Sequence, residues 1–148
     1  MNIQILKGSE AREIVNPFYE FVGSPHHQAR DEDVFFILRD TQNTIGLVRF
    51  CIEEGISLLR SMNIHPEYRG KKLGLQLLKA FEEYINIQNQ TKVFCIPYAH
   101  LEKFYSQIGF QKTSIDIAPQ YLINRLRLYQ SKYPEKEFII MCRFQKQM

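Results

Sequence analysis

The chain has no apolar run long enough to cross a membrane and no block of arginine or lysine. A transmembrane helix needs about 20 consecutive apolar residues, so none is expected. The formal net charge is only +3 and is dispersed, which does not indicate nucleic-acid binding. The N-terminal residues also lack the basic start, apolar core and cleavage site of a signal peptide. We therefore expect a cytoplasmic protein without membrane or nucleic-acid partners.

Cysteine is scarce as well, and Cys51, Cys95 and Cys142 lie far apart in the sequence. Each lies in an apolar, strand-like segment, where a buried structural thiol is more common than a metal ligand. We therefore expect three reduced core thiols and no metal site. The adjacent His26 and His27 do not change this expectation, because a zinc site needs further ligands that this loop does not offer.

The composition is that of one ordinary globular domain. Of 148 residues, 45% are hydrophobic and 24% are charged, as in typical globular proteins. No repeat, low-complexity tract or linker divides the chain. We expect a single domain over residues 1–148. Its oligomeric state, monomer or homodimer, is left open.

Strand-like and helical segments alternate along the chain. Strands are expected over residues 2–6, 34–40, 44–53, 56–65, 92–97, 110–115 and 137–144. Helices are expected over residues 9–16, 17–23, 99–109 and 119–133, with another that begins at residue 73. Pro17 should break the first helical stretch, because proline cannot donate the hydrogen bond that a continuing helix needs.

Two of these strands should fold back on each other at Glu54 and Gly55, which favour a tight hairpin turn. In the second strand the apolar alternation slips at Leu59 and Arg60, which predicts a β-bulge there. The strand–helix–strand unit over residues 56–97 should form a right-handed parallel crossover. The sequence therefore predicts a mixed α/β domain.

Residues 66–75, PEYRGKKLGL, join a strand to a helix. The first turn of a helix leaves N–H groups without partners and carries partial positive charge. Gly70 and Gly74 would let an anion approach closely, and the stretch adds three basic residues, Arg69, Lys71 and Lys72. It therefore predicts a phosphate or pyrophosphate site, although it matches neither the dinucleotide fingerprint nor the P-loop. The alternative is that the glycines serve a turn and packing and the lysines are solvated.

Two motifs resemble those of the GNAT superfamily of N-acetyltransferases. MNIHPEYRGKKLGLQLLKAF is similar to its acyl-CoA-binding signature, Gln/Arg-x-x-Gly-x-Gly/Ala after the fourth strand. Arg69 and Gly74 match this pattern, whereas Lys72 stands where the first glycine usually lies. HLEKFYSQIGF is similar to the second signature, a helical tyrosine followed four residues later by Gly-Phe. The resemblance covers roughly residues 33–112.

The resemblance implies the GNAT fold, a sheet of about seven strands that splays between the fourth and fifth strands and carries helices on both faces. It also implies acetyl-CoA as cosubstrate. The pantetheine arm would pair with the backbone of Met62, Asn63 and Ile64. The pyrophosphate would bind beside Arg69 on the backbone of Gly70, Lys71, Lys72, Leu73, Gly74 and Leu75.

The same resemblance implies direct transfer of the acetyl group to a primary amine of a small molecule or peptide, with Tyr105 as the general acid for the departing thiolate. Tyr105 also lies on the apolar stripe of its helix, so a purely structural role is the alternative. With a silent Tyr105, the chain would be a non-catalytic acyl-CoA sensor on the same fold.

No residue stands out as the base that accepts the proton of the amine. Glu53, Glu54, Asp31, Glu32, Asp33 and His100 are weak candidates, and solvated or capping positions are the simpler interpretation for the carboxylates. Tyr98 lies where many relatives carry an asparagine that contacts the cofactor, so this contact is in doubt.

The resemblance implies an acceptor pocket formed by residues 16–30 and 113–137. The helix at 119–133 in the second segment carries four polar aromatic or basic residues, Tyr121, Arg125, Arg127 and Tyr129. This helix could be a lid that recognises an anionic group on the acceptor. The simpler interpretation, which we favour, is a helix packed on the sheet with its arginines in water.

Overall fold

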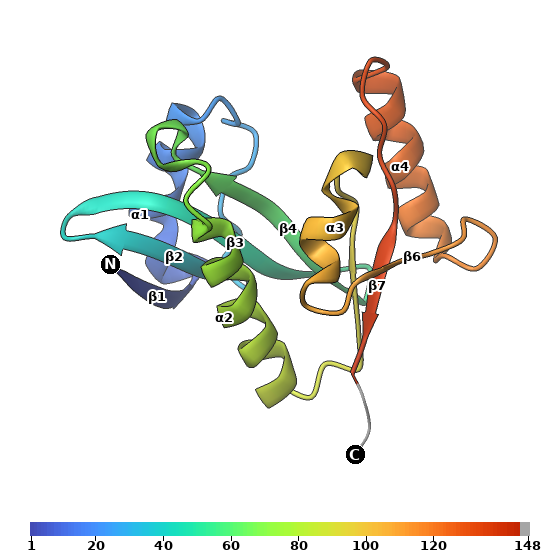
Figure 1. Cartoon of the computed structure of the whole chain (residues 1–148), viewed down its shortest axis with the longest axis horizontal. Coiled ribbons are helices and arrows are strands. Elements are labelled where there is room, and N and C mark those ends of the chain that lie inside the picture. Colours follow the sequence, from blue (N-terminus) through green and yellow to red (C-terminus); the bar gives the residue numbers. More distant parts are fainter. Residues whose placement is uncertain (146–148) are drawn as a thin grey trace.

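The computed structural model describes residues 1–145, which form a seven-stranded mixed sheet with four α-helices (Figure 1). The strands are β1 (Asn2–Lys7), β2 (Val34–Asp40), β3 (Asn43–Glu53), β4 (Ile56–Ile64), β5 (Lys92–Cys95), β6 (Gln111–Lys112) and β7 (Met141–Phe144). The helices are α1 (Gly8–Phe21), α2 (Leu73–Ile87), α3 (Glu102–Ser106) and α4 (Gln120–Lys132), with 3-10 turns η1 (Pro66–Tyr68) and η2 (Ala99–Leu101). The domain range expected above, 1–148, ends with three residues outside the described part.

The sheet has the strand order β1-β2-β3-β4-β5-β7-β6. Strands β1 to β4 form an antiparallel meander, and α2 then crosses to β5, which runs parallel to β4 as predicted. Strands β4 and β5 are in register only at Leu58 and Phe94, and beyond this pair they diverge (Figure 1). The expected splay is confirmed, and it leaves the later part of β4 without a partner on that side.

Helices cover both faces of the sheet, as predicted. On one face Leu77 and Phe81 of α2 pack in a cluster with Phe36 and Phe50 of the sheet. On the other face α1 covers the first strands and α4 covers the last, where Leu122 is buried. None of the helices within residues 1–145 is both long and apolar enough to cross a membrane.

The predicted break at Pro17 is wrong, because α1 runs without interruption from Gly8 to Phe21. A proline removes one backbone hydrogen bond from a helix but leaves its other bonds available. Buried residues on both sides of the proline, Ala11, Val15, Phe18 and Tyr19, form one stripe against the sheet. Burial of this continuous stripe offsets the lost bond.

The predicted bulge is present but lies further along β4. Arg60 still pairs with Arg49, whereas Asn63 pairs with Leu47, so the extra residue falls at Ser61 and Met62. Ser61 has a φ of 57°, which is the left-handed region. The polarity of Arg60 suggested an earlier slip, but its side chain lines a cavity while its backbone keeps the regular register.

The two strands that close the sheet are shorter than predicted. Strand β6 contains only Gln111 and Lys112, and β7 begins at Met141. Ahead of β7, Phe138 makes an isolated bridge to Tyr98. Ile139 and Ile140, between this bridge and β7, belong to no strand, although Ile139 N donates to Pro97 O and Ile140 O accepts from Thr113 N.

The three cysteines are buried and unpaired, as predicted. Burial is the main factor that raises the pKa of Cys51 to about 12 and that of Cys142 to about 11. These thiols therefore stay protonated at neutral pH, which fits a packing role.

Candidate active site

The loop between β4 and α2 has the backbone expected of an anion site. Gly70 has a φ of 80° and Lys72, the N-cap of α2, has a φ of 60°. Within the described residues, the N–H groups of residues 70 to 75 donate to no acceptor outside the helix. The loop thus presents unpaired donors at a helix N-terminus. Lys72 contributes through its backbone, in a conformation that glycine would adopt with less strain.

The second glycine of this loop has a packing role. A Cβ atom added to Gly74 would lie 3.0 Å from Cζ of Phe104, so Gly74 lets α2 approach α3 closely. Arg69 is exposed, and its Nε donates to the carbonyl oxygen of Ile64 at 3.1 Å. The packing alternative considered for the loop therefore holds for Gly74, while Gly70 remains open to solvent.

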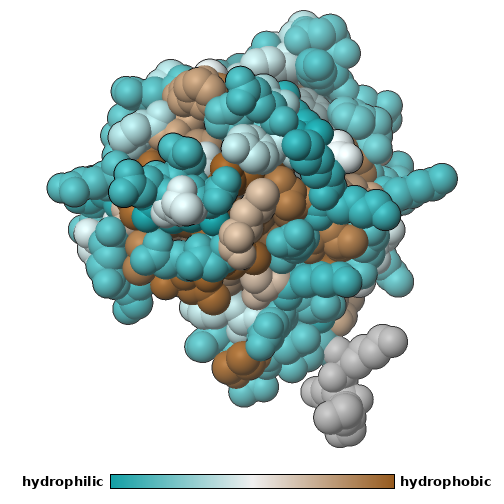
Figure 2. Space-filling view, turned by 60° about the vertical axis from the view of Figure 1, so that its left-hand side comes forward, coloured by the Kyte–Doolittle hydropathy of each residue, from teal (hydrophilic) through white to brown (hydrophobic). Residues whose placement is uncertain are grey.

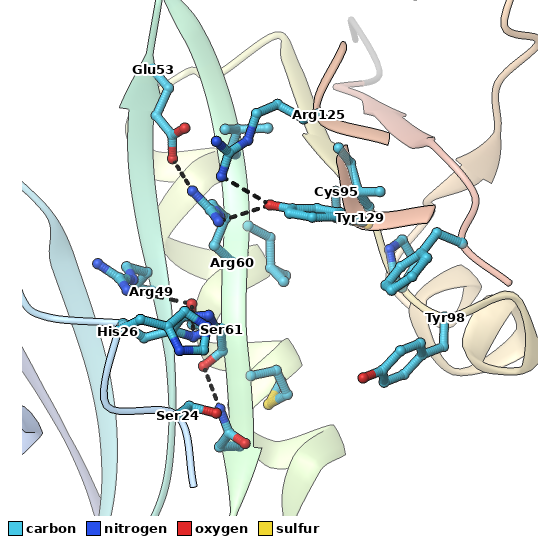
Figure 3. A pocket seen from close by; sticks show the side chains of 18 of the residues that line it. Ser24, His26, Arg49, Glu53, Arg60, Ser61, Cys95, Tyr98, Arg125 and Tyr129 are labelled. Carbon is cyan, nitrogen blue, oxygen red and sulfur yellow. Dashed lines mark hydrogen bonds and ion pairs between the residues drawn. The ribbon is translucent and has the colours of Figure 1, made fainter. Parts of the chain in front are cut away.

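A cavity of about 690 Å³ lies where β4 and β5 diverge (Figure 3). Its lining brings Met62 and Asn63 of β4 together with Tyr105 of α3 and Tyr98. It also includes residues from both predicted acceptor segments, 16–30 and 113–137. Ile64 and the loop residues 69–75 are not part of this lining.

Tyr105 is buried, with 6% of its surface exposed, and its ring meets Phe104 and Phe110 edge to face. Burial, with a smaller effect of Cys95, raises the pKa of Tyr105 well above its usual value. The phenol therefore keeps its proton at neutral pH. This position is compatible with both roles considered for Tyr105, because the ring packs in the core while the residue lines the cavity.

Glu53 is not solvated, contrary to the interpretation favoured from the sequence. Nη1 of Arg60 donates to Glu53 Oε2 at 2.5 Å, and the Tyr121 hydroxyl donates to Oε1 at 2.5 Å. Burial opposes ionisation, but these two partners lower the pKa of Glu53 to about 2. Tyr121 lies on α4, far away in sequence, so local pattern could not show this contact. The carboxylate is ionised and occupied, which makes it a poor base.

None of the other candidate bases is an unpaired group in the cavity. Asp31, Glu32, Glu54 and His100 are exposed and do not line it. Asp33 does line it, but the residue is fully buried and its Oδ2 accepts a hydrogen bond from Arg49 at 2.9 Å. Asp33 therefore serves as the partner of a buried cation.

A polar chain missed by the sequence analysis continues from Arg49. Its Nη2 donates to Ser61 Oγ at 3.4 Å (Figure 3). Ser61 Oγ also lies 3.0 Å from Nδ1 of His27. Burial, then His26, Arg49 and Arg60, lowers the pKa of His27 to about 4. His27 is therefore neutral at pH 7. No cluster of three or more metal-binding side chains occurs within residues 1–145.

Residues along one side of α4 face the cavity. The interpretation favoured from the sequence, in which the arginines of this helix lie in water, is therefore wrong in part. Tyr121, Arg125 and Tyr129, spaced by four residues, line the cavity, whereas Arg127 is exposed and does not. Nη2 of Arg60 and Nη2 of Arg125 both donate to the Tyr129 hydroxyl, at 2.8 and 3.2 Å (Figure 3). The helix both packs on the sheet through Leu122 and supplies polar groups to the cavity.

A second, smaller hollow of about 430 Å³ lies between α1, the start of β3 and η1. Phe21 stacks there on His65 at 4.8 Å between ring centroids. Figure 2 brings this side of the molecule forward and shows hydrophobic patches broken up by hydrophilic side chains. The residues predicted for catalysis or donor binding do not line this hollow.

Comparison with known proteins agrees with this geometry. Residues 7–120 match the family model described as an acetyltransferase (GNAT) domain, which confirms the resemblance seen in the two motifs. No match was found among curated proteins.

Three solved structures illustrate the similarity of the fold. A GNAT-family acetyltransferase from Staphylococcus aureus is 18% identical, with a TM-score of 0.64, and the match covers 98% of this chain and 100% of that chain. An acyl-CoA N-acyltransferase from Pseudomonas aeruginosa is 14% identical, with a TM-score of 0.67 and coverage of 97% and 99%. N-acetylglutamate synthase from Neisseria gonorrhoeae, complexed with coenzyme A and N-acetyl-glutamate, is 15% identical, with a TM-score of 0.63 and coverage of 99% and 36%.

Proposed function

The chain belongs to the GNAT acetyltransferase family, and from this premise we propose that it transfers the acetyl group of acetyl-CoA directly to a primary amine of a small molecule or peptide. One observation carries the proposal. A single cavity joins Met62, Asn63 and Tyr105 to residues of both acceptor segments. Direct transfer requires both substrates to meet in one site, held in reactive geometry.

The residues present fit acetyl-CoA. Beyond Leu58 the backbone of β4 lacks a partner on the β5 side, so Met62, Asn63 and Ile64 can pair with the amide groups of the pantetheine arm. The unpaired N–H groups of residues 70 to 75 suit the pyrophosphate. Arg69, Lys71 and Lys72 add positive charge. Bound there, acetyl-CoA would supply the thioester.

Tyr105 is the proposed general acid. It lines the cavity, and burial keeps its proton on the phenol. A thiolate that departs beside it would gain a strong hydrogen bond and then the proton. The surrounding rings fix the phenol in place, which reduces the reorganisation needed during the reaction.

The amine must react in its neutral form. Glu53 accepts hydrogen bonds from Arg60, Tyr121 and Cys51, and His27 has a lowered pKa, so neither is a strong base. We propose that the amine loses its proton to water before attack, as the cationic side chains around the cavity disfavour the ammonium form. This assigns no single residue as the base.

We also propose that the protein is cytoplasmic. Three buried, unpaired thiols suit the reducing cytoplasm.

The test is amine-dependent release of thiol from acetyl-CoA, with mass spectrometry of the acetylated amine. The purified chain is incubated with acetyl-CoA and a panel of amines, and a reaction without protein is the control. We expect thiol release that saturates with one class of amine. If acetyl-CoA binds but no amine in a broad panel is acetylated, the chain is instead a non-catalytic acyl-CoA sensor.

A further inference from the structure

The acceptor half of the cavity has a surplus of positive charge. The charged side chains of the whole cavity lining are five cations, Arg30, Arg49, Arg60, Arg125 and Lys132, and two anions, Asp33 and Glu53. All of them come from the α1–β2 loop, the β3–β4 hairpin and α4, on the acceptor side. This half of the cavity therefore has a net attraction for anions.

Both anions are already engaged by partners. Asp33 is paired with the buried Arg49 at 2.9 Å, and Glu53 is paired with Arg60 at 2.5 Å. Within the described residues, no carboxylate lies within ion-pair distance of Arg125. Its guanidinium instead donates to the neutral Tyr129 hydroxyl and lies 5.3 Å from the centre of that ring. Arg125 is thus a half-buried cation without an anionic partner.

Arg60 and Arg125 also lie close to each other. Because a nitrogen of each donates to the same Tyr129 oxygen, at 2.8 and 3.2 Å, these nitrogens are no more than about 6 Å apart. Figure 3 shows them converging on this oxygen from β4 and from α4. Arg60 is paired with Glu53, but no carboxylate of the described residues is paired with Arg125, so an anion between the two guanidinium groups would pair with Arg125 and gain a second contact from Arg60.

We propose that the acceptor amine carries a carboxylate or phosphate group, which binds between Arg60 and Arg125. Guanidinium groups suit such anions because their donors match the oxygens in pairs. The Tyr129 hydroxyl, now shared by the two arginines, would be displaced or would join the contact. This inference rests on the proposed function and names the class of acceptor for that site.

The lowered pKa of His27 agrees with this assignment, because the same cationic side chains contribute to it. Among the causes of its lowered pKa are the charges of Arg49 and Arg60, after burial and His26. An acceptor amine in the same cavity meets the same charges, which favour its neutral, nucleophilic form. A doubly cationic acceptor would be disfavoured there, whereas an amine with an attached anion would not.

The test compares four amines of similar size with the full chain and saturating acetyl-CoA. These are 3-aminopropionate, 2-aminoethyl phosphate, propylamine and 1,3-diaminopropane, which carry a carboxylate, a phosphate, no second charge and a second cation. We expect at least one anionic amine to have a kcat/KM about tenfold or more above that of propylamine, since a hydrogen bond to a charged group is worth about one factor of ten or more. The diamine should be the poorest, and the two anionic amines show which anion fits better.

Variants of α4 locate the effect. Arg125→Gln should lower this preference for the anionic amine about tenfold, mainly through KM, and Arg125→Lys should retain part of it. The matched control is Arg127→Gln, which removes an exposed arginine of the same helix outside the cavity lining. It should leave the preference unchanged. A melting temperature for each variant verifies that it is folded.

The inference is overturned if propylamine or the diamine is preferred, or if Arg125→Gln and Arg127→Gln behave alike. Such results would leave amine acetylation intact and so would spare the proposed function. If no amine is acetylated and acetyl-CoA does not stabilise the chain, the proposed function fails and this inference fails with it.

Discussion

The proposed site has two parts, which we call the donor half and the acceptor half, and they are built from different chemical groups. The donor half would use backbone groups, namely the edge of β4 that lacks a partner and, outside the cavity lining, the N–H groups that follow Gly70. In the acceptor half the contacts come from side chains, including the Glu53–Arg60 pair and its partner Tyr121. The residues of the donor half lie close together in the sequence. Those of the acceptor half come from β3, β4 and α4, which are far apart in the sequence.

This difference suggests how one fold can keep its donor and change its acceptor. A backbone site would tolerate changes of side chain, such as Lys72 in the position where the resemblance implies a glycine. A side-chain network changes with each substitution, because a buried charge that loses its partner is costly. The donor half should therefore be robust to mutation and the acceptor half sensitive.

The largest effect is expected at the buried ion pair of the acceptor half. Arg49→Leu leaves the fully buried Asp33 without its closest partner, and we expect the free energy of unfolding to fall by about 3–5 kcal/mol. Urea denaturation measures the change. The double variant Asp33→Asn/Arg49→Leu should recover much of the loss, and a loss below about 1 kcal/mol in the single variant would show that the acceptor half is less sensitive than we argue.

The next effect concerns the residue where the two halves meet. Tyr105→Phe removes the proposed acid but keeps the buried ring, so kcat should fall by about 100-fold or more while the Kd for acetyl-CoA stays nearly constant. Steady-state kinetics and a binding titration measure the two quantities. Unchanged turnover with every accepted amine would remove Tyr105 from the mechanism.

A smaller effect should show that the donor loop uses its backbone. Lys72→Gly relieves a left-handed conformation and should stabilise the fold by about 1 kcal/mol, with little change in acetyl-CoA affinity. The matched control is Lys71→Gly, at a neighbour without positive φ, which should not stabilise. A strong loss of affinity in Lys72→Gly alone would mean that the lysine side chain, rather than the backbone, holds the donor.

The smallest effect is a dependence of stability on pH from the acceptor half. The folded pKa of His27, about 4, lies below the usual value of 6.5, so the unfolded chain binds more protons between these values. Stability is complete above about pH 6.5 and falls as the pH is lowered toward 4. Because His27 is only half-buried, we expect about 1 kcal/mol or less after solvent screening.

Denaturation at pH 7.5 and 5.0 measures this slope. His27→Gln should flatten it, whereas His100→Gln, at an exposed residue outside the cavity, should not. Glu53, with a pKa of about 2, adds a further loss only below about pH 4.5. An equal slope in wild type and His27→Gln would contradict the neutral, cavity-facing role of this histidine.

The same contrast explains what could be predicted from the sequence. The splay between β4 and β5 and the parallel crossover through α2 follow from local spacing and two motifs. Pro17 misled the prediction because burial of the stripe on α1 outweighed one lost hydrogen bond. Arg60 misled it because a polar side chain was interpreted as a change of register.

The resemblance indicated the two segments that line the acceptor side of the cavity, but the contacts within it could not be predicted because they join residues distant in sequence. Nothing near Glu53 indicates that Tyr121 and Arg60 would hold it. Some indication was present in Arg49, a lone charge in an apolar strand, and in the four-residue spacing of Tyr121, Arg125 and Tyr129 on α4. Neither pattern shows by itself which face of the sheet the side chains would share.

The most direct test of the central claim is a thermal-shift titration of the intact chain with acetyl-CoA. A ligand that binds only the folded state at 100 times its Kd should stabilise it by about 2.7 kcal/mol, which would appear as a clear, saturable rise in melting temperature. Coenzyme A should give a similar rise, because the proposed donor half would contact the part that both molecules share. No stabilisation at saturating acetyl-CoA would contradict the assignment of the β4 edge and the loop at residues 69–75 as the donor site.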